Sequence, residues 1–281
     1  MTTGQNLRPS PIAGTWYPGE PATLTRSIDR FLSAAQPQKI DGQIIALIVP
    51  HAGHRYSGVV AAFAFNAIRG MPVKNVAVIS PMHQFHPARL LTTAHDAYVT
   101  PLGSIPVNHE LVTRLNKLLK ADLGDGLTPI VADQEHSLEI QLPFLQRVFS
   151  DGFELVPVMM RDQSPDTARA LANGLAKTMP AGSLLVASSD LSHFYSDAEA
   201  KALDGAILKA IGDFSPESVY QVEAEERGFA CGLGAITAIL WAAREMGADK
   251  VTILNHATSG DVTGDRSSVV GYASAVVYKT K

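Results

Sequence analysis

The stretch Gln43-Ile-Ile-Ala-Leu-Ile-Val-Pro-His-Ala-Gly-His-Arg-Tyr-Ser-Gly58 decides the fold of this chain. Residues 44–49 are all apolar and four of the six are β-branched, which is typical of a strand buried on both faces of a parallel sheet. Pro50 ends the strand because it has no amide proton to donate, and residues 57–70 favour a helix opened by a serine cap. His51 is therefore expected where the carboxyl end of a strand turns toward a helix, which is where ligands bind in open α/β sheets.

Two further strands end in the same way. Residues 75–80 form a short apolar run that His83 follows, and residues 184–189 form another that His193 follows. Parallel strands point in one direction, so their carboxyl ends meet at one edge of the sheet. The sequence therefore predicts that His51, His83 and His193 lie on a single rim.

Strands alternate with helices from residue 43 onward, which favours a single three-layer α/β/α domain over residues 1–281 with a mostly parallel central sheet. Strands are expected at residues 43–49, 75–80, 154–160, 184–189, 251–255 and 269–277. Between residues 85 and 107 we expect a short β excursion beside that sheet. Residues 133–149 are expected to form a helix that Pro143 kinks or restarts. Residues 1–22 are expected to be an extended segment docked on the domain, because Trp16 and Tyr17 favour burial.

Composition excludes several classes of protein. Hydrophobic residues make up 46% and charged residues 18%, which permits a sizeable core and excludes global disorder. The net charge of −4 lacks the basic footprint of a nucleic-acid binder, and the longest apolar block, residues 232–243, is too short to span a bilayer. One cysteine, Cys231, excludes an internal disulfide, and no apolar signal core opens the chain, so we expect a cytoplasmic protein. The oligomeric state stays open, a homo-oligomer included.

His51 and His83 are the strongest candidates for metal ligands. Imidazole is the commonest borderline ligand, and two rigid strand ends would fix its position. The alternative is that each ring satisfies a buried backbone carbonyl. Cys231 is either a soft thiolate ligand at a helix N-terminus or a buried, inert thiol.

Asp190 and His193 are three residues apart and can serve one acid–base site, with the carboxylate orienting the imidazole. The alternative is that Asp190 caps a short turn. Glu135, His136 and Glu139 either form a metal cluster or face solvent on a helix; solvation or support of the site is the safer expectation. Four other histidines are expected at the surface: His54, His86, His95 and His109. Three residues near the rim are candidates for substrate contacts: His54, Tyr56 and Gln84. The loop at residues 259–265 lacks the lysine of a P-loop, so a tight turn is expected there.

Several motifs in this order resemble the Memo family, whose prokaryotic members are called AmmeMemoRadiSam system protein B. The motifs are Ala13-Gly-Thr-Trp-Tyr-Pro18, Pro50-His-Ala-Gly53, Tyr56-Ser-Gly58, Ser80-Pro-Met-His-Gln84, Glu135-His-Ser-Leu-Glu139, Leu142-Pro-Phe144, Ser188-Ser-Asp-Leu-Ser-His-Phe194 and Ser259-Gly-Asp-Val-Thr-Gly-Asp265. The resemblance implies a fold similar to the class III extradiol (LigB-type) non-haem iron dioxygenases. It implies that His51 and His83 are metal ligands and His193 an acid–base residue. Cys231 falls where those dioxygenases have a glutamate ligand, and a thiolate changes the softness and redox behaviour of the site.

Three functions follow as hypotheses. The first is a metal-dependent oxidoreductase that acts on a small molecule through a His51, His83 and Cys231 site, with iron(II) as the expected metal and copper or zinc as alternatives. The second is a non-catalytic protein that binds a metal or a peptide in the same cleft. The third is a Cys–His hydrolase with Cys231 as its nucleophile.

Overall fold

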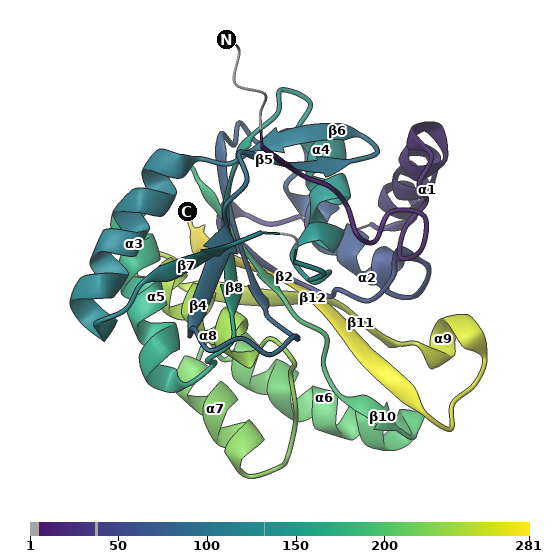
Figure 1. Cartoon of the computed structure of the whole chain (residues 1–281). Coiled ribbons are helices and arrows are strands. Elements are labelled where there is room, and N and C mark those ends of the chain that lie inside the picture. Colours follow the sequence, from purple (N-terminus) through teal and green to yellow (C-terminus); the bar gives the residue numbers. More distant parts are fainter. Residues whose placement is uncertain (1–5, 37–38, 132) are drawn as a thin grey trace.

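The structure is a computed structural model that describes residues 6–36, 39–131 and 133–281. Its main sheet has nine strands: β2 (Gly42–Val49), β3 (Asn75–Pro81), β4 (Leu90–Thr93), β7 (Leu127–Ile130), β8 (Glu154–Met160), β9 (Leu184–Ser188), β10 (His193–Tyr195), β11 (Lys250–Thr258) and β12 (Val269–Thr280). Their order is β10-β12-β2-β9-β3-β8-β4-β7, and β11 pairs with β12 (Figure 1). All six predicted strands belong to this sheet.

The centre of the sheet is parallel and its margins are mixed. Strands β2, β9, β3 and β8 run parallel to their neighbours in that order. Antiparallel pairs join β12 to β2, β10 and β11, and β4 to β8. The pairing of β11 with β12 is antiparallel because the connection of residues 259–268 is shorter than the crossover that parallel strands need.

Helices cover both faces of the sheet, as the α/β/α prediction requires (Figure 1). One face packs against α3 (His109–Leu123), α5 (Pro165–Thr178), α6 (Asp197–Gly212), α7 (Pro216–Ala224) and α8 (Leu233–Glu245). The other packs against α1 (Pro21–Ala34), α2 (His54–Ala67) and α4 (Leu142–Val148). Strand β2 shows why both faces are apolar: Ile48 belongs to the first core, whereas Leu47 and Val49 belong to the second.

Two predicted helix starts were wrong. Residues 133–138 are not helical; a 3₁₀ turn at Glu139–Gln141 leads into α4, which has Pro143 in its first turn. The cause is local competition, since the Glu135 carboxylate accepts the amide protons of His136 and Ser137. Helix α2 begins at His54 rather than after Ser57, whose hydroxyl donates to the Ala52 carbonyl instead of capping the helix.

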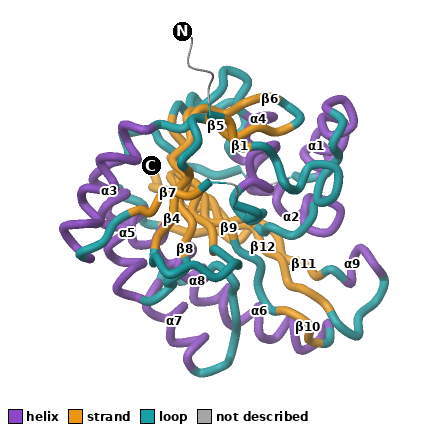
Figure 2. Tube along the Cα trace, viewed as in Figure 1, coloured by secondary structure: helices purple, strands orange, loops and turns teal. Residues whose placement is uncertain are grey.

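A smaller sheet joins the N-terminal segment to the β excursion (Figure 2). It contains β1 (Leu7–Arg8), β5 (Ala97–Thr100) and β6 (Gly103–Pro106), with β1 parallel to β5 and β5 antiparallel to β6. Tyr17 is buried, whereas Trp16 is 37% exposed. Residues 1–5 of the predicted extended segment lie outside the described residues. The predicted turn at 259–265 contains the short helix α9 (Gly260–Thr263), which ends at Gly264 with φ of 79°.

Candidate metal centre

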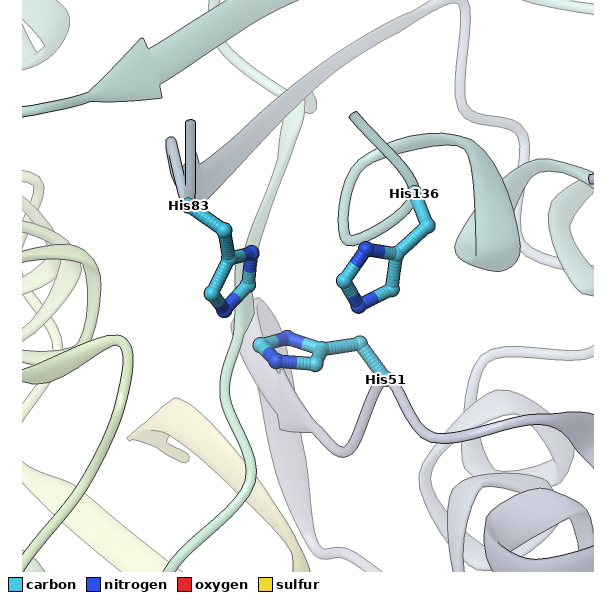
Figure 3. A group of neighbouring side chains, drawn as sticks. All are labelled: His51, His83 and His136. Carbon is cyan, nitrogen blue, oxygen red and sulfur yellow. The ribbon is translucent and has the colours of Figure 1, made fainter. Parts of the chain in front are cut away.

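His51 and His83 come from two strands that flank a third. In the sheet, β9 lies between β2 and β3, and all three run parallel. His51 follows the end of β2 and His83 follows the end of β3, so both leave the same rim. Their ring centroids are 5.3 Å apart, and the rings point toward a common centre (Figure 3). The structure thus brings together the two histidines that the sequence singled out.

His136 is the third member of this cluster, which sequence reasoning did not choose as a ligand. Each of the three histidines offers a nitrogen atom, and these atoms all lie within 4.8 Å of one another. His51 is buried, the side chain of His136 is 19% exposed, and that of His83 is 39% exposed, so the cluster opens to solvent on one side. The signal in the sequence is the pair Glu135-His136, for which a metal cluster is one of two expectations, but the helix expected to carry this pair does not form at residues 133–138.

Glu135 holds two of these histidines in place. Its carboxylate accepts the backbone amide of His83 at 2.7 Å and lies 3.0 Å from His83 Nδ1 and 3.2 Å from His136 Nδ1. Burial of the Glu135 carboxyl opposes its ionisation. The hydrogen bond with His83, the charge of His83, and the backbone amides of Ser137 and His83 favour ionisation more strongly. The pKa of Glu135 therefore lies well below its usual range. A carboxylate that receives Nδ1–H leaves Nε2 free to bind a metal.

The tautomer of His51 follows from its neighbour. Ser188 Oγ donates its single proton to the Ser137 carbonyl at 2.6 Å, so it can only accept from His51 Nδ1, 3.1 Å away. His51 therefore carries its proton on Nδ1 and presents the lone pair of Nε2. Burial, followed by the charges of His136 and His83, lowers the pKa of His51, and burial lowers that of His136 to about 4. Both rings are neutral at pH 7, the form that binds metals.

Cys231 lies beside His51 at the edge of the cluster. Its Sγ is 3.1 Å from His51 Nε2 and accepts the Asp190 amide at 3.2 Å. Burial, and next the charge of Asp190, raises the pKa of the thiol. This disfavours the thiolate that the hydrolase hypothesis needs, whereas a cation held next to the sulfur would favour it.

Asp190 and His193 make hydrogen bonds to different backbone groups. Asp190 Oδ1 accepts the amides of His51 at 2.7 Å and Ala52 at 3.3 Å, so the carboxylate fixes the turn between β2 and α2. His193 Nδ1 instead faces the Leu191 carbonyl at 2.8 Å. Residues 189–192 form no helix and His193 begins β10, so the helical turn that would align two side chains three residues apart does not form here.

The other candidate residues lie around the cluster. His54 is buried against Tyr17 and Phe144 and its Nε2 faces the Ile140 carbonyl at 3.0 Å, so its expected surface position was wrong. His95, 7% exposed, is also buried, because Asn6 of the N-terminal segment covers it and faces its Nδ1 at 2.8 Å. Tyr56 and Gln84 are exposed. None of these four belongs to the cluster of three histidines.

The donor set fits a transition-metal ion. Neutral imidazoles with a nearby thiol suit iron, copper or zinc better than magnesium or calcium, which prefer oxygen ligands. The ionised Glu135 places negative charge behind two of the rings, and a divalent cation would offset it. Within the described residues, no helix is both long enough and apolar enough to cross a membrane.

Comparison with known proteins gives the family. A model described as "Memo-like protein" matches residues 8–276. MEMO1 family proteins are 36% identical in Thermotoga maritima, over 95% of this chain and 98% of the relative, and 34% identical in Nitrosopumilus maritimus, over the same shares. Another from Thermoplasma acidophilum is 35% identical over 94% of this chain and 96% of its own length. Over nearly its whole length, this chain belongs to the Memo family.

Proposed function

We propose that this protein binds one divalent transition-metal ion at His51, His83 and His136, with Cys231 as a further donor, and that the centre serves oxidoreductase chemistry on a small molecule. The observation that supports this best is the convergence of three imidazoles whose ligand atoms lie within 4.8 Å of one another. They are held by a buried carboxylate and a buried serine rather than by chance surface contacts. Such support of ligand histidines is typical of metal sites.

Iron(II) is the proposed metal, with copper and zinc as the alternatives to be tested. Imidazole suits all three, and a thiolate adds a soft ligand. When bound, the metal would polarise a chelating substrate and supply a redox centre. The open side of the cluster, where His83 is 39% exposed, is where a small molecule would reach it.

His193 is the proposed acid–base residue. Because its Nδ1 faces the Leu191 carbonyl at 2.8 Å, that nitrogen carries the proton and Nε2 keeps its lone pair. Burial lowers the pKa of His193, which keeps the ring neutral and able to accept a proton from a substrate at pH 7. Gln84, which follows His83 directly, and Tyr56 in the first turn of α2 are the proposed substrate contacts.

A second candidate function is binding without turnover. Trp16 packs against His136, with ring centroids 4.1 Å apart and ring planes tilted by 34°, and is still 37% exposed. An exposed aromatic face beside the cluster suits a peptide side chain or an aromatic ligand. In this case the metal would hold or shape the ligand and no product would form.

Anaerobic purification with elemental analysis, followed by titration with iron(II), zinc and copper, tests the proposal. His51→Ala should abolish tight binding, with His109→Ala as the matched control, because His109 is exposed on α3. His193→Ala should keep the metal but lose oxygen uptake with catechols. Unchanged affinity in both His51→Ala and Cys231→Ser would show that the rim is not a metal site. Metal binding without oxygen uptake with any of the catechols tested would favour the second candidate function, binding without turnover.

A further inference from the structure

Arg8 is an almost completely buried arginine, 1% exposed, on strand β1. Its Nε and Nη2 donate to the two carboxylate oxygens of Asp133 at 2.9 and 2.6 Å, a bidentate pair. Nη1 donates to Glu139, and Nη2 also donates to the backbone carbonyl of Glu135 at 2.9 Å. The guanidinium lies 4.7 Å from the centre of the Tyr98 ring. One side chain from the N-terminal segment therefore holds three points on a distant stretch of chain.

Two of these contacts, to Asp133 and Glu139, lie on either side of Glu135 and His136 in the sequence. Asp133 Oδ1 also accepts the amide of Glu135 at 3.1 Å, and the Glu135 carboxylate contacts His83 and His136. Contacts thus run without interruption from Arg8 through Asp133 and Glu135 to two of the three clustered histidines. The hydrogen bonds of Arg8 to described residues go to Asp133, Glu139 and the Glu135 carbonyl, and none goes to His83 or His136.

Side-chain anchors set the position of this segment because regular secondary structure does not. Residues 133–138 belong to no helix or strand. Beyond them, the buried Glu139 accepts hydrogen bonds from Ser10 and, at 2.6 Å, from Tyr17, both from the N-terminal segment. The segment that carries His136 is therefore fastened at both ends to residues 8–17.

Charge explains why an arginine is needed. The carboxylates of Asp133 and Glu139 meet one guanidinium in a place from which water is excluded. Burial alone would lower the pKa of Arg8, but the hydrogen bond to Asp133 and the neighbouring negative charges outweigh it and raise the pKa above its ordinary value. A lysine would keep the charge but lose the planar fork that binds Asp133, Glu139 and the Glu135 carbonyl together.

We propose that Arg8 is a positioning residue of the metal centre, which preorganises Glu135 and His136 for metal binding although it does not touch the metal. The inference rests on the proposed metal-binding function. The N-terminal segment is then part of the centre rather than a covering for the fold. A site whose supporting residues are loosened loses affinity even when every ligand remains.

Cobalt(II) titration of the full chain under anaerobic conditions tests this, since cobalt absorption reports both affinity and ligand geometry. We expect Arg8→Lys to bind cobalt 10- to 100-fold more weakly than the wild type, with an absorption spectrum shifted toward that of His136→Ala. Arg147→Lys is the matched control, because Arg147 makes a similar bidentate pair with Asp29 at the surface. Wild-type affinity and spectrum in folded Arg8→Lys would overturn the inference.

A second measurement separates this inference from the proposed function. Amide hydrogen exchange of the metal-free proteins should rise at residues 134–138 in Arg8→Lys and stay unchanged in Arg147→Lys. If the wild type binds no cobalt, the proposed function fails, and unchanged exchange at residues 134–138 would overturn the positioning role on its own. If Arg8→Lys does not fold, Asp133→Asn, which removes one charge from the bidentate pair, takes its place in both measurements with the same expected results.

Discussion

His51 Nε2 lies 3.1 Å from Cys231 Sγ, although 180 residues separate them in the chain. The contact forms because the segment before α8 crosses the rim at β9, where the amide of Cys231 donates to the Asp190 carbonyl at 3.2 Å. The lone pair of His51 Nε2 thus faces the thiol. The thiol can donate to this nitrogen or, at 3.5 Å, to the Asp190 carbonyl, and under the proposed function the sulfur and the nitrogen bind one ion.

Cys231→Ser should therefore lower the affinity for zinc and copper(I) at least tenfold and change the affinity for manganese little. A hydroxyl does not ionise at neutral pH and is a harder ligand than a thiolate. Competition titrations with the three metals measure this, with circular dichroism as the control for folding. No loss for any metal would mean that the three histidines bind the ion without the sulfur, and equal losses for all three would mean that the sulfur does not set the metal preference.

Glu135→Gln should weaken metal binding by about 10- to 100-fold without removing a ligand. The amide keeps the size of the side chain but loses the charge that receives the protons of His83 and His136. Isothermal titration of iron(II) or zinc under anaerobic conditions measures the change. Glu154→Gln is the control, since that carboxylate lies at the exposed start of β8 and bonds to Asn108. An affinity equal to that of the wild type would rule out a role for Glu135 in the centre.

The sequence was sufficient to predict the rim but not the whole cluster. His51 and His83 follow parallel strands, so strand periodicity alone brings them to one edge. His136 could not be placed in this way. Its loop is fixed by the Glu135 carboxylate, which accepts the His136 amide, and by Arg8, which donates to the Glu135 carbonyl from 127 residues away in the chain. Contacts between residues far apart in the chain also explain why the expected surface position of His54 was wrong, since Tyr17 and Phe144 bury its ring.

His54 should make the protein less stable in mild acid. Its burial against Tyr17 and Phe144 holds the pKa of His54 to about 4, against the opposing effect of its bond to Ile140. Between that value and the ordinary 6.5, the unfolded chain binds a proton that the folded ring cannot, so stability falls as pH falls through this window. The contribution of His54 to the loss between pH 7 and pH 5 is expected to be about 2 kcal/mol.

Urea unfolding of the metal-free protein at both pH values measures this loss, and His54→Gln is the comparison. Glutamine can still donate to the Ile140 carbonyl but does not titrate, so its variant should lose about 2 kcal/mol less between the two pH values. The lowered pKa values of His51, His136 and His193 add to the loss, and the pKa of Asp190, raised to about 7 by burial, opposes it, but these contributions are common to both proteins. The same loss in both would contradict the prediction.

Gly271→Ala should destabilise the protein because a buried carboxylate occupies the space that a side chain would need. A Cβ at Gly271 would lie 2.0 Å from Oδ2 of Asp204, a fully buried residue. That oxygen lies 2.7 Å from His256 Nε2, and the other carboxylate oxygen, Oδ1, accepts the Ser192 amide at 3.0 Å. Moving Asp204 would strain both bonds, and we expect a loss of about 1–3 kcal/mol.

Gly205→Ala is the matched substitution, since a Cβ at Gly205 on α6 meets nothing within 4 Å. Alanine has the higher helix propensity, so this change should stabilise the protein by about 0.5–1 kcal/mol. Denaturant unfolding of both variants gives the comparison. Because Ser192 precedes His193, Gly271→Ala should also shift the NMR signals of the His193 ring, whereas Gly205→Ala should not. If Gly271→Ala were as stable as the wild type and left those signals in place, Asp204 would have room to move and would not be what fixes the segment that carries His193.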